Sequence, residues 1–481
     1  MPIAVRFLAY VMLIMAVGSV VCAIFSRLDS YDDQALLWLL YSALLTTCGV
    51  ALVLATDLDV SSNTDREQAL ITCGILTLFL PMIAAVPFYL YGNTLLISWF
   101  ESVSGLTTTG ASALARPSLL PDALVAWRVM LEWLGGWLFL VFALGIQPVL
   151  NLAGTAFTLD YLPHGEATTY FAKVMRVGRT IGRLYVSITG MAVLLLMLAG
   201  LPAGLAVSFS MIGVSTGGYI PSEQGLSLYI GGLPIIAVLV LLTLGCLNFS
   251  LHYAAVRGDV SVYWRDRETR SLFRLLALGV LAVFTISLLT GAIQGDILRL
   301  RDVFFLALSA VSTTGISPLG TQTAPLSIGI LLLCLTVAGG MAGSTTGGIK
   351  VLRAQLIDRF VNAELIRVSN PHRLNPVSFD RRIIKAPDML GVWALVLVIA
   401  VTIAVGSLFL SALQMPFLTA IAVSVSSATN AGPLPELMDA RFAGYGALSP
   451  GMMMTCAVLM LLGKLEFLVL LSFIFIKFFK R

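Results

Sequence analysis

The segment Thr107-Thr108-Thr109-Gly110 decides the fold, because three further copies of it follow along the chain. Reading four residues each time, the other copies are Val214-Ser215-Thr216-Gly217, Ser312-Thr313-Thr314-Gly315 and the degenerate Thr429-Asn430-Ala431-Gly432. Their glycines are 107, 98 and 117 residues apart. A serine stands six residues before the glycine in three copies and seven residues before it in the second: Ser104, Ser309, Ser426 and Ser210. One structural unit is therefore predicted to occur four times.

Apolar segments surround each copy in the same order. A spanning helix comes first, then a short helix of about three turns, then the Thr/Gly segment and a second spanning helix. In the third copy we expect a span over 275–294, a short helix over 302–312 and a second span from Pro325 onward. The expected pairs of spans in the other copies are 69–90 with 123–150, 182–201 with 227–255, and 388–411 with 449–476.

Composition independently predicts an integral membrane protein. The chain has 481 residues, of which 58% are hydrophobic and 11% charged, and its mean hydropathy is +0.95. Soluble domains contain about 25% charged residues, so this chain cannot cover a water-exposed surface of the required size. Two further charge-free segments, 7–26 and 34–56, precede the repeats and bring the expected total to ten spans with four re-entrant segments. A cleaved signal peptide is the alternative for the first of them.

Two charge-free runs of 47 residues, 303–349 and 389–435, are too long for a single span and must fold back inside the membrane.

Basic residues predict the orientation of the chain. If the N-terminus is cytoplasmic, 22 of the 29 Lys and Arg residues fall on inner segments, as the positive-inside rule requires. Both termini are then cytoplasmic, and the re-entrant segments lie on the outer side. We expect most outer acidic residues, Glu101 and Asp302 among them, to be solvated or capping residues.

The repeated Thr/Gly segments predict a site for a dehydrated cation. Such an ion needs several oxygen ligands at once, which carbonyl-bearing strands around one axis can supply. Glycine permits backbone conformations that turn carbonyls inward, and each short helix directs the negative end of its dipole toward the axis. The alternative is that the small residues pack helices closely, as GxxxG motifs do. The shared order of residues in the four copies favours the ion filter.

The fourfold motif, the short helices and the two leading spans together resemble the ion-translocating subunit of the Trk/Ktr/HKT superfamily of potassium transporters, of the TrkH/TrkG type. The resemblance covers essentially the whole chain. It implies an all-α polytopic membrane protein with four repeats (helix, re-entrant pore helix, helix) around one pore. The implied potassium-filter residues are Thr108, Thr109, Gly110, Ser215, Thr216, Gly217, Thr313, Thr314, Gly315, Asn430, Ala431 and Gly432. We expect two N-terminal helices over 1–66 and pore repeats over 67–155, 156–258, 259–370 and 371–481.

A glycine-rich interruption lies in the second span of the third repeat, over 338–348. Five glycines in eleven residues oppose a continuous helix, because each is about 1 kcal/mol less favourable than alanine. A flexible loop in the permeation path is the natural inference, and a plain hinge or packing notch is the alternative. The resemblance implies a gate made of Gly339, Gly340, Gly343, Ser344, Thr345, Thr346, Gly347 and Gly348.

Lys464 lies some four turns into the last expected span, where a charge is unfavourable and commonly functional. Glu466 is two positions away and therefore a poor helix partner. The resemblance implies that Lys464 faces the pore just inside the filter and weakens cation binding there. A structural ion pair with a carboxylate on another helix is the alternative. Arg128 and Glu132 are spaced i, i+4 and are expected to form a local pair.

These features predict potassium uptake across the cell inner membrane, with K⁺ as the transported ion, no bound cofactor and no enzymatic activity. The chain has no Walker A motif, and its three histidines offer no obvious base for a serine within the membrane. A net charge of +4 does not suggest nucleic-acid binding. The basic segment 350–385, which Asn370-Pro371 and Asn375-Pro376 are expected to break into an exposed loop, is the expected docking surface for a cytoplasmic protein. The resemblance implies such a partner, namely cytoplasmic TrkA-type nucleotide-binding (RCK) subunits under a homodimer of membrane subunits. The alternatives are a secondary transporter for another solute and a Na⁺-conducting member of the superfamily. Channel-like flow and symport with Na⁺ or H⁺ both remain open.

Overall fold

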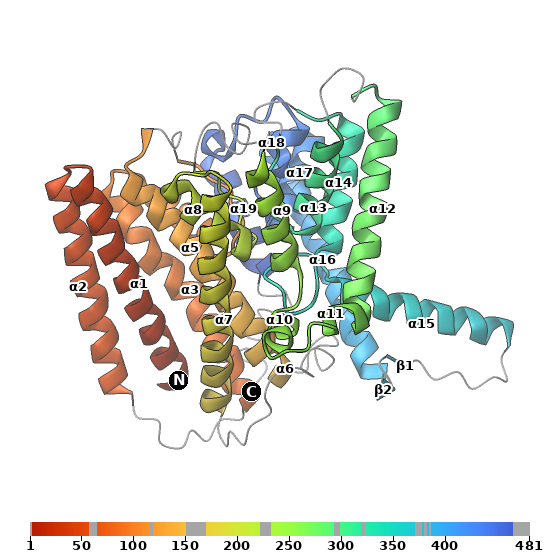
Figure 1. Ribbon diagram of the computed structural model, residues 1–481, viewed down its shortest axis with the longest axis horizontal. Coiled ribbons are helices and arrows are strands. Elements are labelled where there is room, and N and C mark those ends of the chain that lie inside the picture. Colours follow the sequence, from red (N-terminus) through yellow and green to blue (C-terminus); the bar gives the residue numbers. More distant parts are fainter. Residues whose placement is uncertain are drawn as a thin grey trace.

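The computed structural model describes residues 2–56, 65–114, 119–150, 170–221, 232–292, 299–318, 323–370, 378–379, 382–383 and 386–464. Helices account for almost all of its regular structure (Figure 1). In this part of the chain, seven helices are long and apolar enough to cross a membrane, or eight if one bent pair counts as a span. Each Thr/Gly segment follows a shorter apolar helix: α4 (Leu95–Leu106), α8 (Ala203–Ser215), α13 (Leu300–Val311) and α17 (Phe417–Thr429). The predicted all-α membrane architecture is thereby confirmed.

Two helices, α1 (Pro2–Leu28) and α2 (Asp32–Ala55), form a hairpin at one side of the bundle (Figure 1). The buried Trp38 of α2 packs on Trp127 of the first repeat, with ring centroids 5.3 Å apart. The opposite face of α2 leaves Leu40 and Leu54 59% and 79% exposed. Such exposed leucines on a spanning helix are suited to contact with lipid tails.

The four repeats follow in sequence order. Repeat one contains α3 (Asp65–Leu90), α4 and α5 (Asp122–Val141), which continues through a π-helical turn (Phe142–Ile146) into α6 (Gln147–Leu150). Repeat two contains α7 (Tyr170–Leu198), α8, α9 (Leu233–Cys246) and α10 (Phe249–Val256). Repeat three contains α11 (Val262–Arg265), α12 (Arg267–Leu289), α13, α14 (Leu326–Ala338) and α15 (Val351–Ser369). The hairpin of β1 (Ser378–Phe379) and β2 (Arg382–Ile383) precedes repeat four, which contains α16 (Ala386–Ala412), α17, α18 (Leu434–Met438), a 3-10 turn (Tyr445–Ala447) and α19 (Pro450–Lys464).

The repeats form a closed ring. Each second span packs against the short helix of its own repeat and against the short helix of the next one. Thus α5 contacts α4 and α8, α9 contacts α8 and α13, and α14 contacts α13 and α17. The last second span, α19, contacts α17 and returns to α4 of the first repeat. Because the contacts run once around the four repeats, the ends of the short helices meet at one centre.

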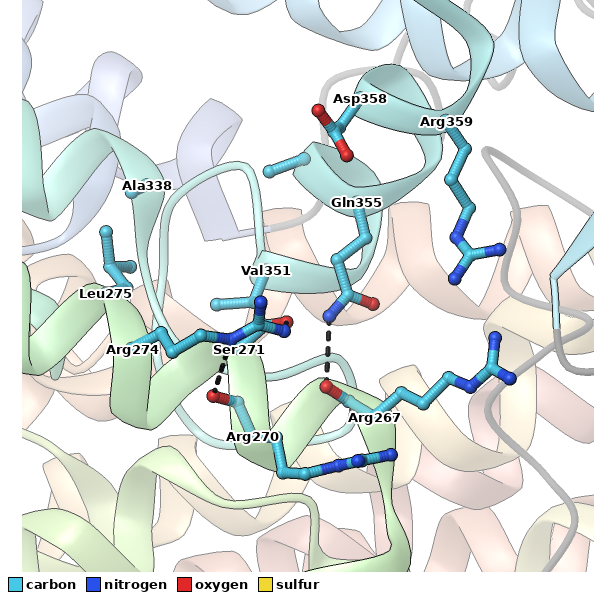
Figure 2. A pocket seen from close by; sticks show the side chains of 11 residues that line it. Arg267, Arg270, Ser271, Arg274, Leu275, Ala338, Val351, Gln355, Asp358 and Arg359 are labelled. Atoms are coloured by element: carbon cyan, nitrogen blue, oxygen red, sulfur yellow. Dashed lines mark hydrogen bonds between the residues drawn. The ribbon is translucent and has the colours of Figure 1, made fainter. Parts of the chain in front are cut away.

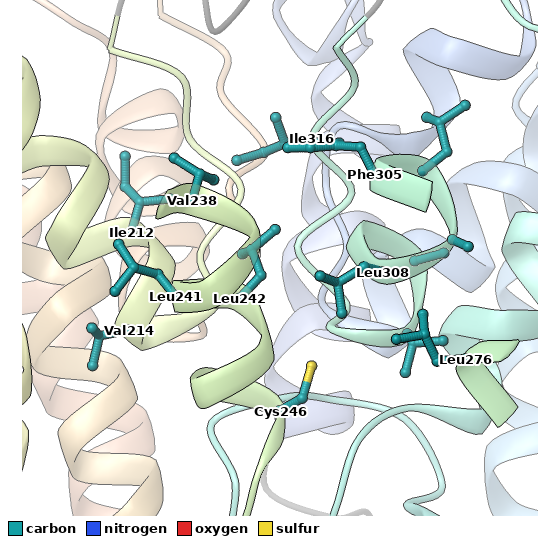
Figure 3. Close-up of a cluster of buried hydrophobic side chains, with 14 of the residues drawn as sticks. Ile212, Val214, Val238, Leu241, Leu242, Cys246, Leu276, Phe305, Leu308 and Ile316 are labelled. Atoms are coloured by element: carbon teal, nitrogen blue, oxygen red, sulfur yellow. The ribbon is translucent and has the colours of Figure 1, made fainter. Parts of the chain in front are cut away.

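A buried apolar cluster joins repeats two and three (Figure 3). Leu242 of α9 points toward Leu308 and Phe305 of α13, whereas Leu241 of α9 points toward Ile212 of α8. All five side chains are no more than 3% exposed. The cluster therefore holds the short helices α8 and α13 in place from the outside of the ring.

The second span of repeat two differs from the continuous helix that the sequence predicts, whereas α14 of repeat three ends where the glycine-rich interruption is expected. The span expected over 227–255 is broken at Leu247 and Asn248, where α9 and α10 are bent by 104°. Asn248 begins α10 as its N-cap, and its side chain accepts a hydrogen bond from the Ser250 N–H over 2.9 Å. Helix α14 ends at Ala338 after 13 residues and is shorter than a span. Residues 465–476 of the last expected span lie outside the described residues.

The basic segment after the glycine-rich loop begins as a helix, which corrects the prediction of an exposed loop over 350–385. Helix α15 covers Val351–Ser369 and projects sideways from the bundle (Figure 1). The helix ends at the Asn370-Pro371 pair, because Asn370 is its C-cap residue. Arg373, Arg381 and Lys385 lie outside the described part of the chain.

Candidate ion pathway at the centre of the four repeats

Each short helix ends in the same hydrogen-bonded turn. In repeat one, the Thr108 N–H donates to the Gly105 carbonyl over 2.8 Å, and the Thr109 N–H donates to the Ser104 carbonyl over 2.9 Å. This pair of bonds defines a Schellman turn, which contains one left-handed residue. The same pair occurs in all four repeats, and the left-handed residues are Thr108, Thr216, Thr313 and Asn430, with φ of 54°, 52°, 55° and 58°.

Threonine is an unfavourable residue at three of these left-handed positions. A β-branched residue at positive φ is an outlier, and such strain costs roughly 1–3 kcal/mol per residue. The three hydroxyls share one property, which is a hydrogen bond to the glycine-rich loop or to the last span. The bonds join Thr108 Oγ1 to Lys464 Nζ (2.6 Å), Thr216 Oγ1 to Thr345 Oγ1 (3.2 Å), and Thr313 Oγ1 to the Gly347 N–H (2.8 Å). These bonds give a physical reason for threonine where glycine is the least strained choice.

The turns also correct the register of repeat two. The alignment by sequence pairs Gly217 with Gly110. In the structure, the Gly217 N–H donates to the Ile212 carbonyl over 2.9 Å, which is the bond that Thr109 makes in repeat one. Gly217 therefore corresponds to Thr109, and Gly218 corresponds to Gly110. Ser210 is accordingly no counterpart of Ser104, because Ile212 takes that place.

Glycines from the four repeats meet in backbone contact at the centre. They are Gly110, Gly218, Gly315 and Gly432. A Cβ atom on Gly110 would lie 2.2 Å from the Gly218 Cα, and one on Gly218 would lie 2.6 Å from the Thr314 carbonyl oxygen. The Gly432 N–H donates to the Thr109 carbonyl over 2.7 Å. Only glycine fits where backbones approach this closely. The centre is therefore built from peptide groups of all four repeats.

The loop between α14 and α15 lies directly against these turns. The Thr345 hydroxyl oxygen lies 3.2 Å from the carbonyl oxygen of Val214 and 3.2 Å from that of Gly245, and either carbonyl can accept its hydrogen. A Cβ atom on Gly347 would lie 2.1 Å from the Thr429 carbonyl oxygen. Thr345 and Gly347 thus touch the turns of repeats two, three and four. Every residue of the loop from Gly339 to Thr346 is buried.

The break between α9 and α10 accommodates the same loop. The Met341 N–H donates to the Cys246 carbonyl over 3.0 Å, and the Phe249 N–H donates to the Gly343 carbonyl over 3.0 Å. Cys246 and Phe249 flank the break, and their backbone groups would be paired within a continuous helix. The loop of repeat three therefore satisfies the groups that the broken helix of repeat two leaves open.

Two lysines are buried beside the loop. Lys464 is 5% exposed, and its Nζ donates to the Thr345 carbonyl over 2.8 Å as well as to Thr108. Lys350 is 3% exposed, and its Nζ donates to the Thr346 carbonyl and, over 3.0 Å, to the Thr346 hydroxyl. Among the described residues, Lys464 has no carboxylate partner; Glu466 lies outside them. The sequence predicts a special position for Lys464, whereas it indicates Lys350 only as one of the basic residues of the inner side.

A buried charge cluster lies behind the Thr/Gly segment of the first repeat. Arg128 donates to Glu101 Oε2 over 2.8 Å and to Glu132 Oε1 over 3.1 Å, so the predicted Arg128–Glu132 pair is confirmed. It also donates to the Ala111 carbonyl over 3.1 Å, next to Gly110. The expectation for Glu101 was wrong: its side chain is fully buried, and it accepts the Ala113 N–H. The burial of this cluster could have been predicted from the sequence, because ionisable residues within apolar membrane segments are usually buried and paired.

Comparison with known proteins places this architecture among cation transporters. The family model TrkH, described as "Cation transport protein", matches residues 91–479. The Trk system potassium uptake protein TrkH of Salmonella typhimurium is 30% identical over 397 residues, which are 81% of each chain. The Trk system potassium uptake protein TrkI of Halomonas elongata is 26% identical over 478 residues, covering 97% of this chain and 94% of the relative.

A solved structure shares the complete fold. The crystal structure of the potassium transporter TrkH from Vibrio parahaemolyticus superposes with a TM-score of 0.87 at 24% sequence identity, covering 100% of this chain and 99% of the other. The agreement extends over all four repeats and the leading hairpin. It confirms the expected multi-span fold, and the matching family model is that of cation transport proteins. The chain belongs to the TrkH family of cation transport proteins.

Proposed function

We propose that this chain takes up potassium through the centre of its four repeats. Its relatives are named potassium uptake proteins. The observation that carries the proposal is the convergence of four identical Schellman turns, which bring peptide groups of every repeat to one point. Backbone carbonyls from several strands can replace the hydration shell of a potassium ion.

Potassium binds, in this proposal, to carbonyl oxygens of the residues around each left-handed position. The filter residues predicted from the sequence keep this role, with Gly218 replacing Gly217 at the position of Gly110. The C-terminal ends of α4, α8, α13 and α17 add partial negative charge toward the same centre.

The loop Gly339–Lys350 acts as the gate. It lies against the filter turns and is attached through backbone and hydroxyl groups rather than through a packed helix. Each ordinary hydrogen bond contributes about 0.5–1.5 kcal/mol net, so the loop can detach without unfolding its neighbours. Lys464 holds the loop to the first turn and places a positive charge beside the path.

Serine substitution at Gly110 and at Gly218 tests the filter. In both variants the new Cβ atom meets another repeat within 2.6 Å, so we expect weaker potassium uptake at micromolar external K⁺ and poorer discrimination against Na⁺. Gly204→Ser is the matched control, because a Cβ atom at this position of α8 meets nothing within 4 Å. The measurement is rubidium and sodium flux into liposomes that contain the purified protein.

The outcomes of this experiment separate the alternatives. Wild-type uptake and selectivity in both filter variants would contradict the filter. Sodium flux above potassium flux in the wild-type protein would indicate a Na⁺-conducting transporter, and no cation flux would indicate another solute. The reversal potential distinguishes channel-like flow from coupling to Na⁺ or H⁺.

The proposal has three further parts. The chain is regulated by cytoplasmic TrkA-type nucleotide-binding subunits, it assembles as a homodimer, and it resides in the inner membrane with both termini cytoplasmic. Its support is the position of α15: the Val351 N–H donates to the Gly340 carbonyl over 2.9 Å, so a partner on α15 acts on the loop through one helix. The test is co-purification in mild detergent, followed by neutralisation of Arg373, Arg381 and Arg382. If the chain purifies alone and nucleotide leaves uptake in native membranes unchanged, the partner is wrong and the pore assignment is unaffected.

A further inference from the structure

A cavity of about 600 Å³ lies between the first turns of α12 and the first turns of α15 (Figure 2). Four arginines line it, Arg267, Arg270 and Arg274 from α12 and Arg359 from α15. Among the described residues that line the cavity, Asp358 contributes the one carboxylate. Its apolar wall consists of Leu275, Ala338, Val351 and Ala354. The cavity is therefore strongly basic on one side and apolar on the other.

Three of these arginines lie on the face of α12 that lines the cavity, where the Arg270 guanidinium also donates to the Asp266 and Arg265 carbonyls over 3.4 Å. Residues 267, 270 and 274 lie on one face of α12 because they are three and four positions apart. The Arg274 guanidinium is held along the helix by hydrogen bonds to the Ser271 hydroxyl over 2.8 Å and to the Arg270 carbonyl over 3.3 Å. Gln355 of α15 donates to the Arg267 carbonyl over 3.1 Å and ties the two helices together. The positive-inside rule explains basic residues at this end of α12, but not their convergence with Arg359, which follows far along the chain.

The chemistry of the cavity suits a phosphate group attached to hydrocarbon. A guanidinium group binds phosphate oxygens through two parallel hydrogen bonds. Beyond the arginines, α12 continues with Leu278 and Leu281, which are 66% and 61% exposed. A ligand whose phosphate lies among the arginines can therefore extend its apolar part along α12. A free polyphosphate shares the phosphate chemistry but leaves this apolar surface unused.

We propose that this cavity binds the headgroup phosphate of an anionic phospholipid from the membrane leaflet at this end of α12. Basic pockets between transmembrane helices are suited to such headgroups. The arginines of α12 and Arg359 of α15 hold the phosphate from two sides, so the lipid bridges the two helices.

The bridged helices also hold the glycine-rich loop. Glu268, beside Arg267, accepts hydrogen bonds from the Ala342 N–H of the loop over 2.6 Å and from the Leu352 N–H of α15 over 3.1 Å. A lipid that fixes α15 on α12 stabilises this junction and thereby the loop against the filter turns. This consequence, unlike the binding itself, rests on the proposed gate: bound anionic lipid lowers ion flux.

Lipid binding is tested on the purified full-length protein in nanodiscs. The probe is palmitoyl-oleoyl-phosphatidylglycerol, with the zwitterionic phosphatidylcholine of the same chains as the comparison, and lipid retained after transfer to detergent is counted by native mass spectrometry. The double variant Arg270→Gln/Arg274→Gln is expected to retain phosphatidylglycerol about tenfold less well, because two charge-assisted contacts are lost. Arg257→Gln/Arg265→Gln removes the same charge from neighbouring exposed positions outside the cavity and is expected to bind as wild type.

Two further variants keep the test independent of folding defects. Ala354→Phe fills the cavity from an exposed position without changing any charge, and it is expected to reduce retention as well. Arg270→Lys/Arg274→Lys keeps the charge and is expected to restore part of the binding. Equal retention of both lipids by the wild type, or equal loss in the cavity and control double variants, would overturn the site.

A second arm separates the two sources of phosphate and the regulatory step. Inorganic pyrophosphate is titrated calorimetrically into protein in phosphatidylcholine nanodiscs. Binding of pyrophosphate that depends on Arg270 and Arg274, without selective retention of phosphatidylglycerol, would replace the lipid by a soluble phosphate and overturn the proposal.

In phosphatidylglycerol liposomes, the cavity variants are expected to conduct rubidium severalfold faster than the wild type. Lipid retention with unchanged flux would leave the binding site standing and contradict the gate instead.

Discussion

The ammonium group of Lys464 donates a hydrogen bond to the Thr345 carbonyl oxygen over 2.8 Å and joins the last span to the glycine-rich loop. The same group donates to the Thr108 hydroxyl over 2.6 Å. One buried side chain therefore connects α19, the loop and the turn of the first repeat. Removing it should affect the loop and the filter together.

Lys464→Gln is expected to raise the potassium flux about tenfold, because a charge-assisted hydrogen bond to the loop contributes about 1.5–3 kcal/mol. Lys464→Arg is the control, since it keeps a charged donor at this position. Rubidium flux in liposomes is the measurement, with size-exclusion chromatography as the check on folding. Aggregation of Lys464→Gln would instead indicate a purely structural role.

Thr313 offers a way to separate strain from attachment of the loop. Thr313→Gly relieves a left-handed threonine, worth roughly 1–3 kcal/mol, but removes the hydroxyl that accepts the Gly347 N–H over 2.8 Å. We expect an unchanged or higher melting temperature together with faster flux. Thr313→Ser keeps the hydroxyl and should conduct like the wild type. Slower flux in the glycine variant would speak against a loop that restricts conduction.

Deletion of Gly339–Gly348 should give the largest increase in flux and abolish the response to regulation. The variant should also be less stable, because the carbonyl of Cys246 loses its partner at the break between α9 and α10, at about 1–3 kcal/mol per unpaired buried group. Flux and melting temperature are measured on the same preparation. Unchanged or slower flux in an inserted, folded deletion variant would favour a simple hinge.

The buried cluster around Arg128 predicts an order of stabilities. Arg128→Met leaves Glu101 and Glu132 buried without their cation, and it should destabilise the protein by about 3–5 kcal/mol. Glu132→Gln should have a smaller effect, because Glu101 still balances the charge of Arg128. Arg27→Gln breaks an exposed pair with Asp32 and should change stability by less than about 1 kcal/mol. Thermal unfolding in detergent gives the order; equal effects at Arg27 and Arg128 would contradict it.

The fold was predictable because each repeat places its apolar helices and its polar break in the same order. The register of repeat two was not, since Gly217 and Gly218 are adjacent and only backbone hydrogen bonds tell them apart. The i, i+4 spacing predicts Glu132 as the partner of Arg128. It cannot predict Glu101, because this residue lies on another helix. The buried position of Glu101 is likewise a tertiary property.

The broken second span of repeat two shows the same limit. Its sequence around Leu247 and Asn248 has hydrophobicity suited to a continuous helix, and the bend depends on a loop from a different repeat that bonds to Cys246 and Phe249. Helix α15 was missed for a related reason. Its basic residues and the following Asn-Pro pair have the composition of a loop, whereas Leu352 and Leu356 are buried and anchor a helix.

The contact of α19 with α4 has a consequence for biogenesis. Helix α4 leaves the ribosome before the other short helices and α19 leaves it after all of them, so the ring of repeats closes only once the fourth repeat has been synthesised. Until then, Gly110 has no Gly432 beside it, and the first repeats cannot enclose an axis by themselves. A chain that terminates before α19 and still inserts should therefore leave the membrane without an unregulated leak, because the four Thr/Gly segments are enclosed only once the fourth repeat is in place.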